Sequence, residues 1–146
     1  MGGLGPPAGP ETPQEALPGR RMNGVTFDAG GLIALDRNDR RVIALLARAS
    51  ELGVPITIPT TALAQAIRRP SRQARLSRLI RQPSSRVVPL DGLAATRVGV
   101  LLAARGTDDI TDAHVVLCAR RFGEAIVTSD PDDLQRLDPR ATLIVV

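Results

Sequence analysis

The chain has 146 residues, of which 43% are hydrophobic and 23% are charged, so we expect one packed domain instead of two and exclude disorder throughout. All 19 basic residues are Arg and give a net charge of +4, which favours an anionic partner such as nucleic acid. The two Phe are the only aromatic residues and Lys is absent, which excludes base-stacking platforms, Walker-type phosphate loops and Schiff-base chemistry.

The first 24 residues are the least structured part of the pattern. Residues 1–24 contain six of the 13 Gly and five of the 12 Pro, and we expect them to form a flexible tail. They lack the basic start and apolar run of a signal peptide, and no apolar run in the chain is long enough for a membrane span. Cys118 is the only cysteine, which excludes an intrachain disulfide. We therefore expect a cytoplasmic protein.

From Val25 onward, short β-type runs alternate with helical ones. A buried strand at 25–27 ends at Asp28, an apolar helical segment follows at 32–35, and a helix at 41–52 stops at Gly53. A second strand at 55–58 leads to a helix that Thr60 or Thr61 caps and that runs to Arg69. Pro70 interrupts this helix, and Ser71 restarts one that runs to Arg81.

The second half of the chain repeats this alternation. We expect strands at 86–90, 125–127 and 142–146, and helices at 92–104, from Asp109 or Thr111 to Arg121, and at 131–137. Strands separated by helices favour a parallel sheet with both faces covered. The sequence thus predicts a single α/β domain over 25–146, with a mostly parallel central sheet flanked by helices.

Acidic and amide side chains stand where predicted strands end. Ligands of open parallel sheets bind at the carboxyl ends of the strands, and Asp28 and Asp130 lie there. Asp112 and Gln65 lie in the first turns of helices that begin at the same edge. Clustered carboxylates repel one another unless a cation lies among them. Oxygen ligands without His or Cys favour Mg²⁺, with Mn²⁺ as the alternative, and such a site indicates phosphodiester hydrolysis.

Helix capping is the competing explanation for several of these acids. Asp is favoured at helix starts whatever the function, which applies to Asp109 and Asp112, and residues 129–133 also fit a turn and a cap. Asp28 differs, because it follows an apolar strand directly, where an unpartnered carboxylate is costly. Asp130 lies at the end of a predicted strand, and this position favours it over the two acids that follow it.

Two other groups of residues have a structural and a functional interpretation. His114 and Cys118 lie four residues apart on an apolar helix, where core packing is the favoured explanation; the sequence has no Gly-x-Ser-x-Gly motif. No acid occurs between Glu51 and Asp91, so this stretch is either a solvated face or a surface for RNA or an acidic partner. Its arginines are Arg68, Arg69, Arg72, Arg75, Arg78, Arg81 and Arg86.

Four segments together resemble a known family. They are Val-Thr-Phe-Asp-Ala-Gly, Ile-Pro-Thr-Thr-Ala-Leu-Ala-Gln, Thr-Asp-Ala-His-Val-Val and Ala-Ile-Val-Thr-Ser-Asp-Pro-Asp-Asp-Leu. In order and spacing they resemble a PIN domain, most of all the VapC-type toxin ribonucleases, over about residues 25–146. The resemblance implies the toxin of a type II toxin–antitoxin pair: a Mg²⁺-dependent endoribonuclease that hydrolyses RNA with a metal-bound water, forms a homodimer and is inhibited by a small cognate antitoxin.

The resemblance also implies roles for individual residues. Asp28, Asp112 and Asp130 match three family acids that hold the metal and are catalytic, whereas Gln65 stands where the family has Glu. This change removes one charge from the site. The alternative is therefore a catalytically impaired PIN-like module that binds RNA or a partner. The auxiliary residues would be Gln65, Asp109, Asp132 and Thr128, and the RNA-binding residues would be Arg68, Arg69, Arg72 and Arg75.

Overall fold

The computed structural model describes residues 22–146, so residues 1–21 of the expected flexible tail lie outside the described residues. The described part contains a five-stranded parallel sheet in the order β3-β2-β1-β4-β5. This confirms the predicted fold class. The strands are β1 (Val25–Phe27), β2 (Ile56–Pro59), β3 (Ser85–Val88), β4 (Ala125–Thr128) and β5 (Leu143–Val145).

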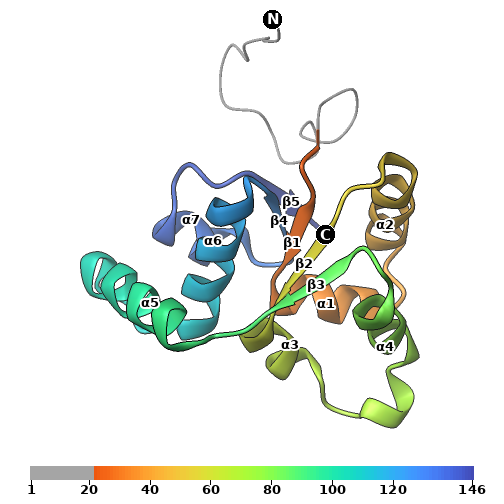
Figure 1. Ribbon diagram of the computed structural model, residues 1–146, viewed down its shortest axis with the longest axis horizontal. Helices are drawn as coiled ribbons and strands as arrows, with labels where there is room; N and C mark the ends of the chain where they lie inside the picture. The colour runs from red at the N-terminus through yellow and green to blue at the C-terminus, as the bar shows by residue number, and fades with distance from the viewer. Residues whose placement is uncertain (1–21) are drawn as a thin grey trace, which may run out of the picture.

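Helices cover both faces of this sheet (Figure 1). One group, with α1, α2 and α4, lies on one side, and α5, α6 and α7 lie on the other. No helix among residues 22–146 is both long and apolar enough to cross a membrane. The helices are α1 (Ala29–Asp36), α2 (Arg40–Leu52), α3 (Thr60–Ala66), α4 (Ala74–Arg81), α5 (Gly92–Arg105), α6 (Ile110–Phe122) and α7 (Pro131–Leu137), with a 3₁₀ turn η2 (Pro70–Arg72).

The core lies on the two faces of the central strands. All three residues of β1 are buried, and Phe27, Ile58 and Val127 are fully enclosed. Successive side chains of a strand point to opposite faces of the sheet. Because helices cover both faces here, all of these side chains are buried and the strand is a continuous apolar run. Pairing of β1 with both β2 and β4 brings their carboxyl ends to one edge of the sheet.

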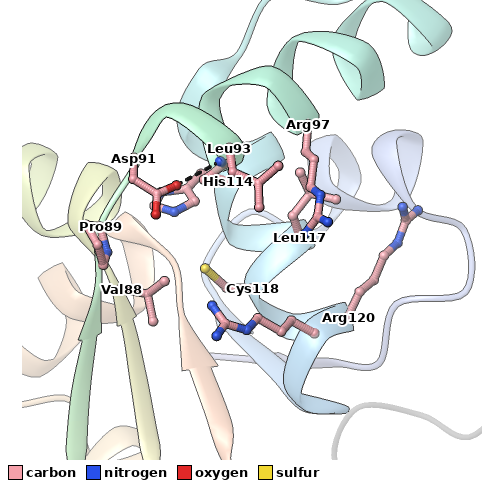
Figure 2. Close-up of a pocket in the computed structure, with 11 residues that line it drawn as sticks. Val88, Pro89, Asp91, Leu93, Arg97, His114, Leu117, Cys118 and Arg120 are labelled. Atoms are coloured by element: carbon pink, nitrogen blue, oxygen red, sulfur yellow. Dashed lines mark hydrogen bonds between the residues drawn. The ribbon is translucent and has the colours of Figure 1, made fainter.

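The region after β2 differs from the prediction. The helix expected to reach Arg69 ends at Ala66, because Ile67 is already extended. Neither Thr60 nor Thr61 is the helix cap; Pro59 holds that position without a side-chain hydrogen bond. The two threonines instead join α3 to other elements: the Thr60 hydroxyl accepts from the Leu90 amide over 3.1 Å, and the Thr61 hydroxyl lies 2.8 Å from Nδ1 of the buried His114. His114 lies beside the start of α5 (Figure 2).

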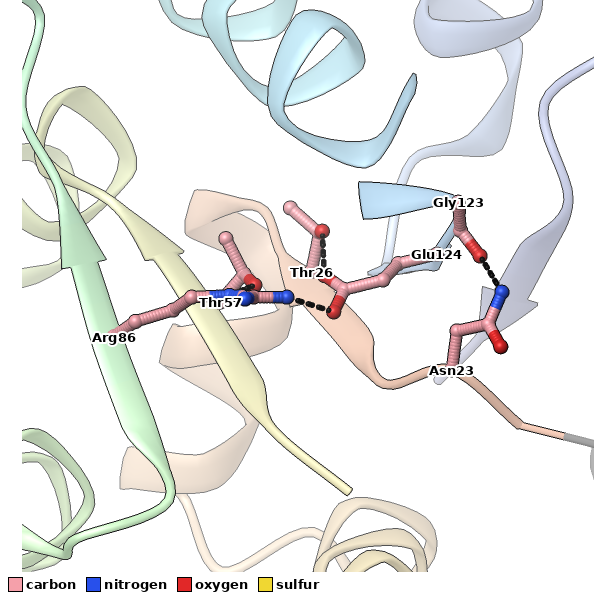
Figure 3. A network of polar contacts seen from close by, with 6 residues as sticks. All are labelled: Asn23, Thr26, Thr57, Arg86, Gly123 and Glu124. Atoms are coloured by element: carbon pink, nitrogen blue, oxygen red, sulfur yellow. Dashed lines mark hydrogen bonds and ion pairs between the residues drawn. The ribbon is translucent and has the colours of Figure 1, made fainter. Parts of the chain in front are cut away.

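A partly buried ion pair joins the strands away from the carboxyl edge (Figure 3). The Glu124 side chain has no exposed surface, and the Arg86 guanidinium donates to it over 2.8 Å. The hydroxyl of Thr26 donates to the other carboxylate oxygen, and Arg86 also donates to Thr57 and lies 3.5 Å above the Phe122 ring. Arg86 therefore belongs to an internal network and not to the basic surface with which the sequence groups it.

Candidate functional site

Asp28 is the most enclosed acid at the carboxyl edge of the sheet. It follows β1 directly, caps α1 by accepting a hydrogen bond from the Gly31 N–H over 2.7 Å, and is 6% exposed. Burial raises its pKa to about 6, helped by the negative charge of Asp130, although hydrogen bonds from Thr128 and the Gly31 and Gly30 amides oppose the shift. At neutral pH this carboxylate is charged in a place that disfavours charge.

Two glycines allow α1 to approach β4 closely. A Cβ on Gly30 would collide with the Ser129 hydroxyl, and one on Gly31 would lie 2.5 Å from the carbonyl oxygen of Val127. The Asp28 amide donates to that same carbonyl over 3.1 Å. The Gly-Gly pair thus brings the start of α1 against the end of β4, which is what places Asp28 near the loop that contains Asp130.

Asp112 lies on α6 and faces the same edge. Asp109 caps this helix and accepts a hydrogen bond from the Asp112 amide over 2.9 Å. Partial burial and the charges of Asp109, Asp28 and Asp133, in that order of importance, together raise the pKa of Asp112 to about 7. Four acids from three different elements therefore act on one another electrostatically.

The loop after β4 places the remaining acids. The buried Thr128 hydroxyl accepts from the Asp130 amide over 2.9 Å and so fixes the turn. Asp130 precedes α7 without a capping hydrogen bond from its side chain, which is exposed. Asp132, the expected auxiliary residue, is exposed too. Its neighbour Asp133 is the acid whose charge acts on Asp112, and it also pairs with Arg136 at 2.9 Å.

Gln65 lies on an exposed part of α3 beside the same helix start. Its amide nitrogen donates to the hydroxyl of the buried Thr111 over 2.9 Å, which leaves its carbonyl oxygen available. Reasoning from the sequence missed Thr111 as a positioning partner, and its place next to Asp112 was the only signal. It also missed Gly30 and Ser129, although two glycines directly after a strand-end Asp are a usable signal for close approach.

The acids at this edge suit a hard divalent cation in donor type and charge. They supply oxygen donors only, and no ion pair within residues 22–146 involves Asp28, Asp112 or Asp130. In the same part of the chain, no group of three or more Asp, Glu, His or Cys side chains is arranged to hold a metal ion. The carboxylates thus repel one another without a cation, and their side chains would have to converge to enclose one.

The predicted basic residues lie on a different surface, where α1 meets the loop between α3 and α4. The buried Gln73 organises this loop: its carbonyl oxygen accepts from the Arg68 and Arg69 amides over 3.0 and 3.1 Å. Arg68, Arg69 and Arg72 line a cavity of about 390 Å³ there. Arg75 extends the same surface along α4 and lines the next cavity, of about 220 Å³.

Comparisons with known proteins agree with this architecture. A family model described as PIN domain matches residues 27–138. The VapBC2 structure from Rickettsia felis, bound to a DNA fragment from its promoter, is similar at a TM-score of 0.61 and 14% identity, over 82% of this chain and 96% of that one. PAE2754 from Pyrobaculum aerophilum is similar at a TM-score of 0.57 and 18% identity, over 85% and 92%. No curated protein matches by sequence.

Proposed function

The chain belongs to the PIN-domain family, whose members are generally nucleases that use divalent metal ions, and we propose that it is a cytoplasmic, Mg²⁺-dependent endoribonuclease and a toxin of the VapC type. Residues 25–146 form the nuclease domain in this proposal. The observation that carries it is the group of uncompensated acids at the carboxyl edge, in which the pKa of Asp28 is raised to about 6 and that of Asp112 to about 7.

In the proposed mechanism, Asp28, Asp112 and Asp130 would hold the metal ion. When bound, Mg²⁺ would lower the pKa of a coordinated water and would neutralise negative charge that develops on the phosphate. The chain's own residues fix the geometry. The Gly31 amide orients the Asp28 carboxylate, the Thr128 hydroxyl holds the Asp130 turn, and Asp109 caps the helix that presents Asp112.

Gln65 determines how much charge the site provides. An amide contributes one neutral oxygen where the family has a carboxylate, so we expect weaker metal binding than in family members with Glu. The hydrogen bond to Thr111 keeps Gln65 beside Asp112. This substitution supports the second candidate function, a catalytically impaired module that binds RNA or a partner protein.

The surface that contains the two cavities beside α1, one at the loop between α3 and α4 and one along α4, is the proposed contact surface for RNA and for the antitoxin. Its arginines include Arg68, Arg69, Arg72 and Arg75. Ile33 lines the first cavity together with Asp36, and Leu35 and Leu46 line the second. Cationic rims around an apolar floor suit both an RNA backbone and an acidic amphipathic segment. An antitoxin seated there would inhibit by occupying the arginines that RNA needs. The similarity to a VapBC complex supports such a partner.

We also propose that the chain forms a homodimer. Val100 of α5 and Ile110 at the start of α6 are 67% and 52% exposed, and large exposed apolar side chains of this kind are typical of contact surfaces. Light scattering of the purified chain measures the mass directly, and a monomer at all concentrations would contradict this part of the proposal.

Cleavage of labelled RNA tests the catalytic proposal. We expect the wild-type chain to cut RNA with Mg²⁺ and not in EDTA, Asp28→Asn to be inactive, and Gln65→Glu to cut at lower Mg²⁺ concentrations. Asp108→Asn is the matched control, because Asp108 is an exposed acid outside the cluster. Cleavage in EDTA, or by Asp28→Asn at the wild-type rate, would refute the mechanism. Activity found only in Gln65→Glu would establish the impaired module instead.

RNA binding in EDTA tests the arginine surface separately from catalysis. Phosphate contacts release counterions, so the affinity should fall steeply with salt. Substituting Arg69 and Arg72 by Ala should weaken binding and flatten this salt dependence, whereas Arg105→Ala, at the far end of α5, should change neither. A salt response that is flat in the wild type would show that the surface does not bind RNA.

A further inference from the structure

A larger cavity lies away from the carboxyl edge, and the proposed function leaves it without a role. It has a volume of about 620 Å³ and lies between the connection from β3 to α5, the first turns of α5, and α6 (Figure 2). None of Asp28, Asp112 or Asp130 lines it. Its volume is in the range of small-molecule pockets, roughly 300–1,000 Å³.

His114 contributes a buried imidazole to the wall of this cavity. The residue is 2% exposed and lines the cavity. Its Nδ1 is hydrogen-bonded to the Thr61 hydroxyl, and its Nε2 is fully buried. The Asp91 charge and the Pro89 carbonyl also act on the ring. The imidazole therefore reports on the wall of the cavity, and the polar contacts of a ligand must come from other side chains.

The charged groups around the cavity favour a negatively charged ligand. Arg97 and Arg121 line it, and neither has an acidic partner within 4 Å among residues 22–146. Arg120 is neutralised by Asp138 at 3.0 Å. Asp91 is the only acid in the lining, and its carboxylate caps α5 by accepting from the Ala94 amide over 2.9 Å. The local balance is therefore positive.

The floor of the cavity is made of carbon and sulfur atoms. Val88 at the end of β3 and Leu117 and Cys118 on α6 form this part of the wall, and Leu93 closes it from α5 (Figure 2). Apolar walls with a few convergent polar groups are typical of sites for small organic molecules. A bare inorganic anion would leave most of this wall in contact with water.

We propose that this cavity binds a small organic anion, in which a carboxylate or phosphate monoester is attached to a compact apolar body. The anionic group faces Arg97 and Arg121, and the apolar body lies on Val88, Leu117 and Cys118. His114 lies in the wall beside this site, where its ring signals report whether the site is occupied. This assignment does not depend on the proposed nuclease activity, because it uses none of the carboxylates at the sheet edge.

The only histidine of the chain provides a direct probe. The full chain, labelled with ¹⁵N-histidine and kept in EDTA, is titrated with hexanoate or phenyl phosphate as the two anionic probes, and with hexanol and inorganic phosphate as the uncharged and the bare-anion controls. We expect saturable shifts of the His114 imidazole signals with the first two only. The response to hexanoate compared with phenyl phosphate then shows which head group the site prefers.

Substitutions test which side chains form the site. The double substitution Arg97→Ala and Arg121→Ala should weaken probe binding at least roughly tenfold, because a charge-assisted contact is lost. Arg105→Ala, elsewhere on α5, should leave the affinity unchanged. Hexanol or inorganic phosphate binding as tightly as the anionic probes, no shift with any probe, or wild-type affinity in the double variant would each overturn the proposal.

Discussion

Removing the buried charge of Asp28 should stabilise the protein while it removes activity. In the absence of a cation the pKa of Asp28 is raised from 3.8 to about 6. A shift of this size means that the ionised carboxylate lowers the free energy of unfolding by about 3 kcal/mol well above pH 6. Asn has nearly the same shape and can still accept the hydrogen bond from the Gly31 amide.

The expected gain in Asp28→Asn is somewhat smaller, because a neutral acceptor binds the amide more weakly than a carboxylate does. We expect about 2 kcal/mol at pH 8 in EDTA, or a rise in Tm of roughly 8 °C. The folded-state pKa lies above the unfolded one, so the stability of the wild type falls as pH rises from 3.8 to about 6. The difference in the free energy of unfolding between the wild type and Asp28→Asn should therefore vanish at pH 4 and grow towards pH 7.

The measurement is urea unfolding followed by circular dichroism, because the chain has neither Trp nor Tyr for fluorescence. Added Mg²⁺ should stabilise the wild type more than Asp28→Asn and so narrow the difference. Asp108→Asn, an exposed acid on the loop before α6, should change stability by less than about 0.5 kcal/mol. Equal stability of the wild type and Asp28→Asn at pH 8, or a difference that does not depend on pH, would refute the reasoning.

Three further outcomes follow from the contacts described above. Gly31→Ala should destabilise the protein by about 2 kcal/mol, since the new Cβ presses on the Val127 carbonyl; Gly99→Ala, with nothing within 4 Å, should be neutral or stabilising, and urea unfolding compares the two. Glu124→Ala should lower the free energy of unfolding by about 2 kcal/mol, because it removes the partner of the partly exposed Arg86 and the acceptor of the buried Thr26 hydroxyl, and an unchanged Tm would contradict this. Removal of divalent metal by EDTA should lower the wild-type Tm, and adding Mg²⁺ should restore it. A Tm that changes with neither EDTA nor Mg²⁺ would show that the acids bind no cation.

The arrangement of the sheet could be predicted from the sequence because its strands are local apolar runs. Each run is bounded by Gly, Pro or Asp and followed by a helical pattern, which indicates a parallel sheet. The ends of elements were harder to predict. The helix expected to reach Arg69 stops at Ala66, where Gln73 binds the amides of Arg68 and Arg69 through its side chain. No periodicity in the sequence indicates such a contact.

The candidate site was predictable only as far as the strand-end rule reaches. That rule selects Asp28 and Asp130, and the structure brings both to one edge with Asp112. Composition was a poorer guide. Arg86 lies within the basic stretch of the sequence, but in the structure it pairs with Glu124, 38 residues away. Pairings of this kind depend on the register of several strands, which a single sequence does not specify.

The all-parallel pairing of β1 with β4 has a consequence for synthesis of the chain. Parallel strands cannot pair through a local hairpin. Asp28 therefore comes close to the loop that contains Asp130 only after β4 has been synthesised and has paired with β1. The acids at the sheet edge therefore remain apart until β4 and the loop that follows it have been synthesised. The acid cluster is thus a late product of chain synthesis, although Asp28 is among the first residues of the fold to be made.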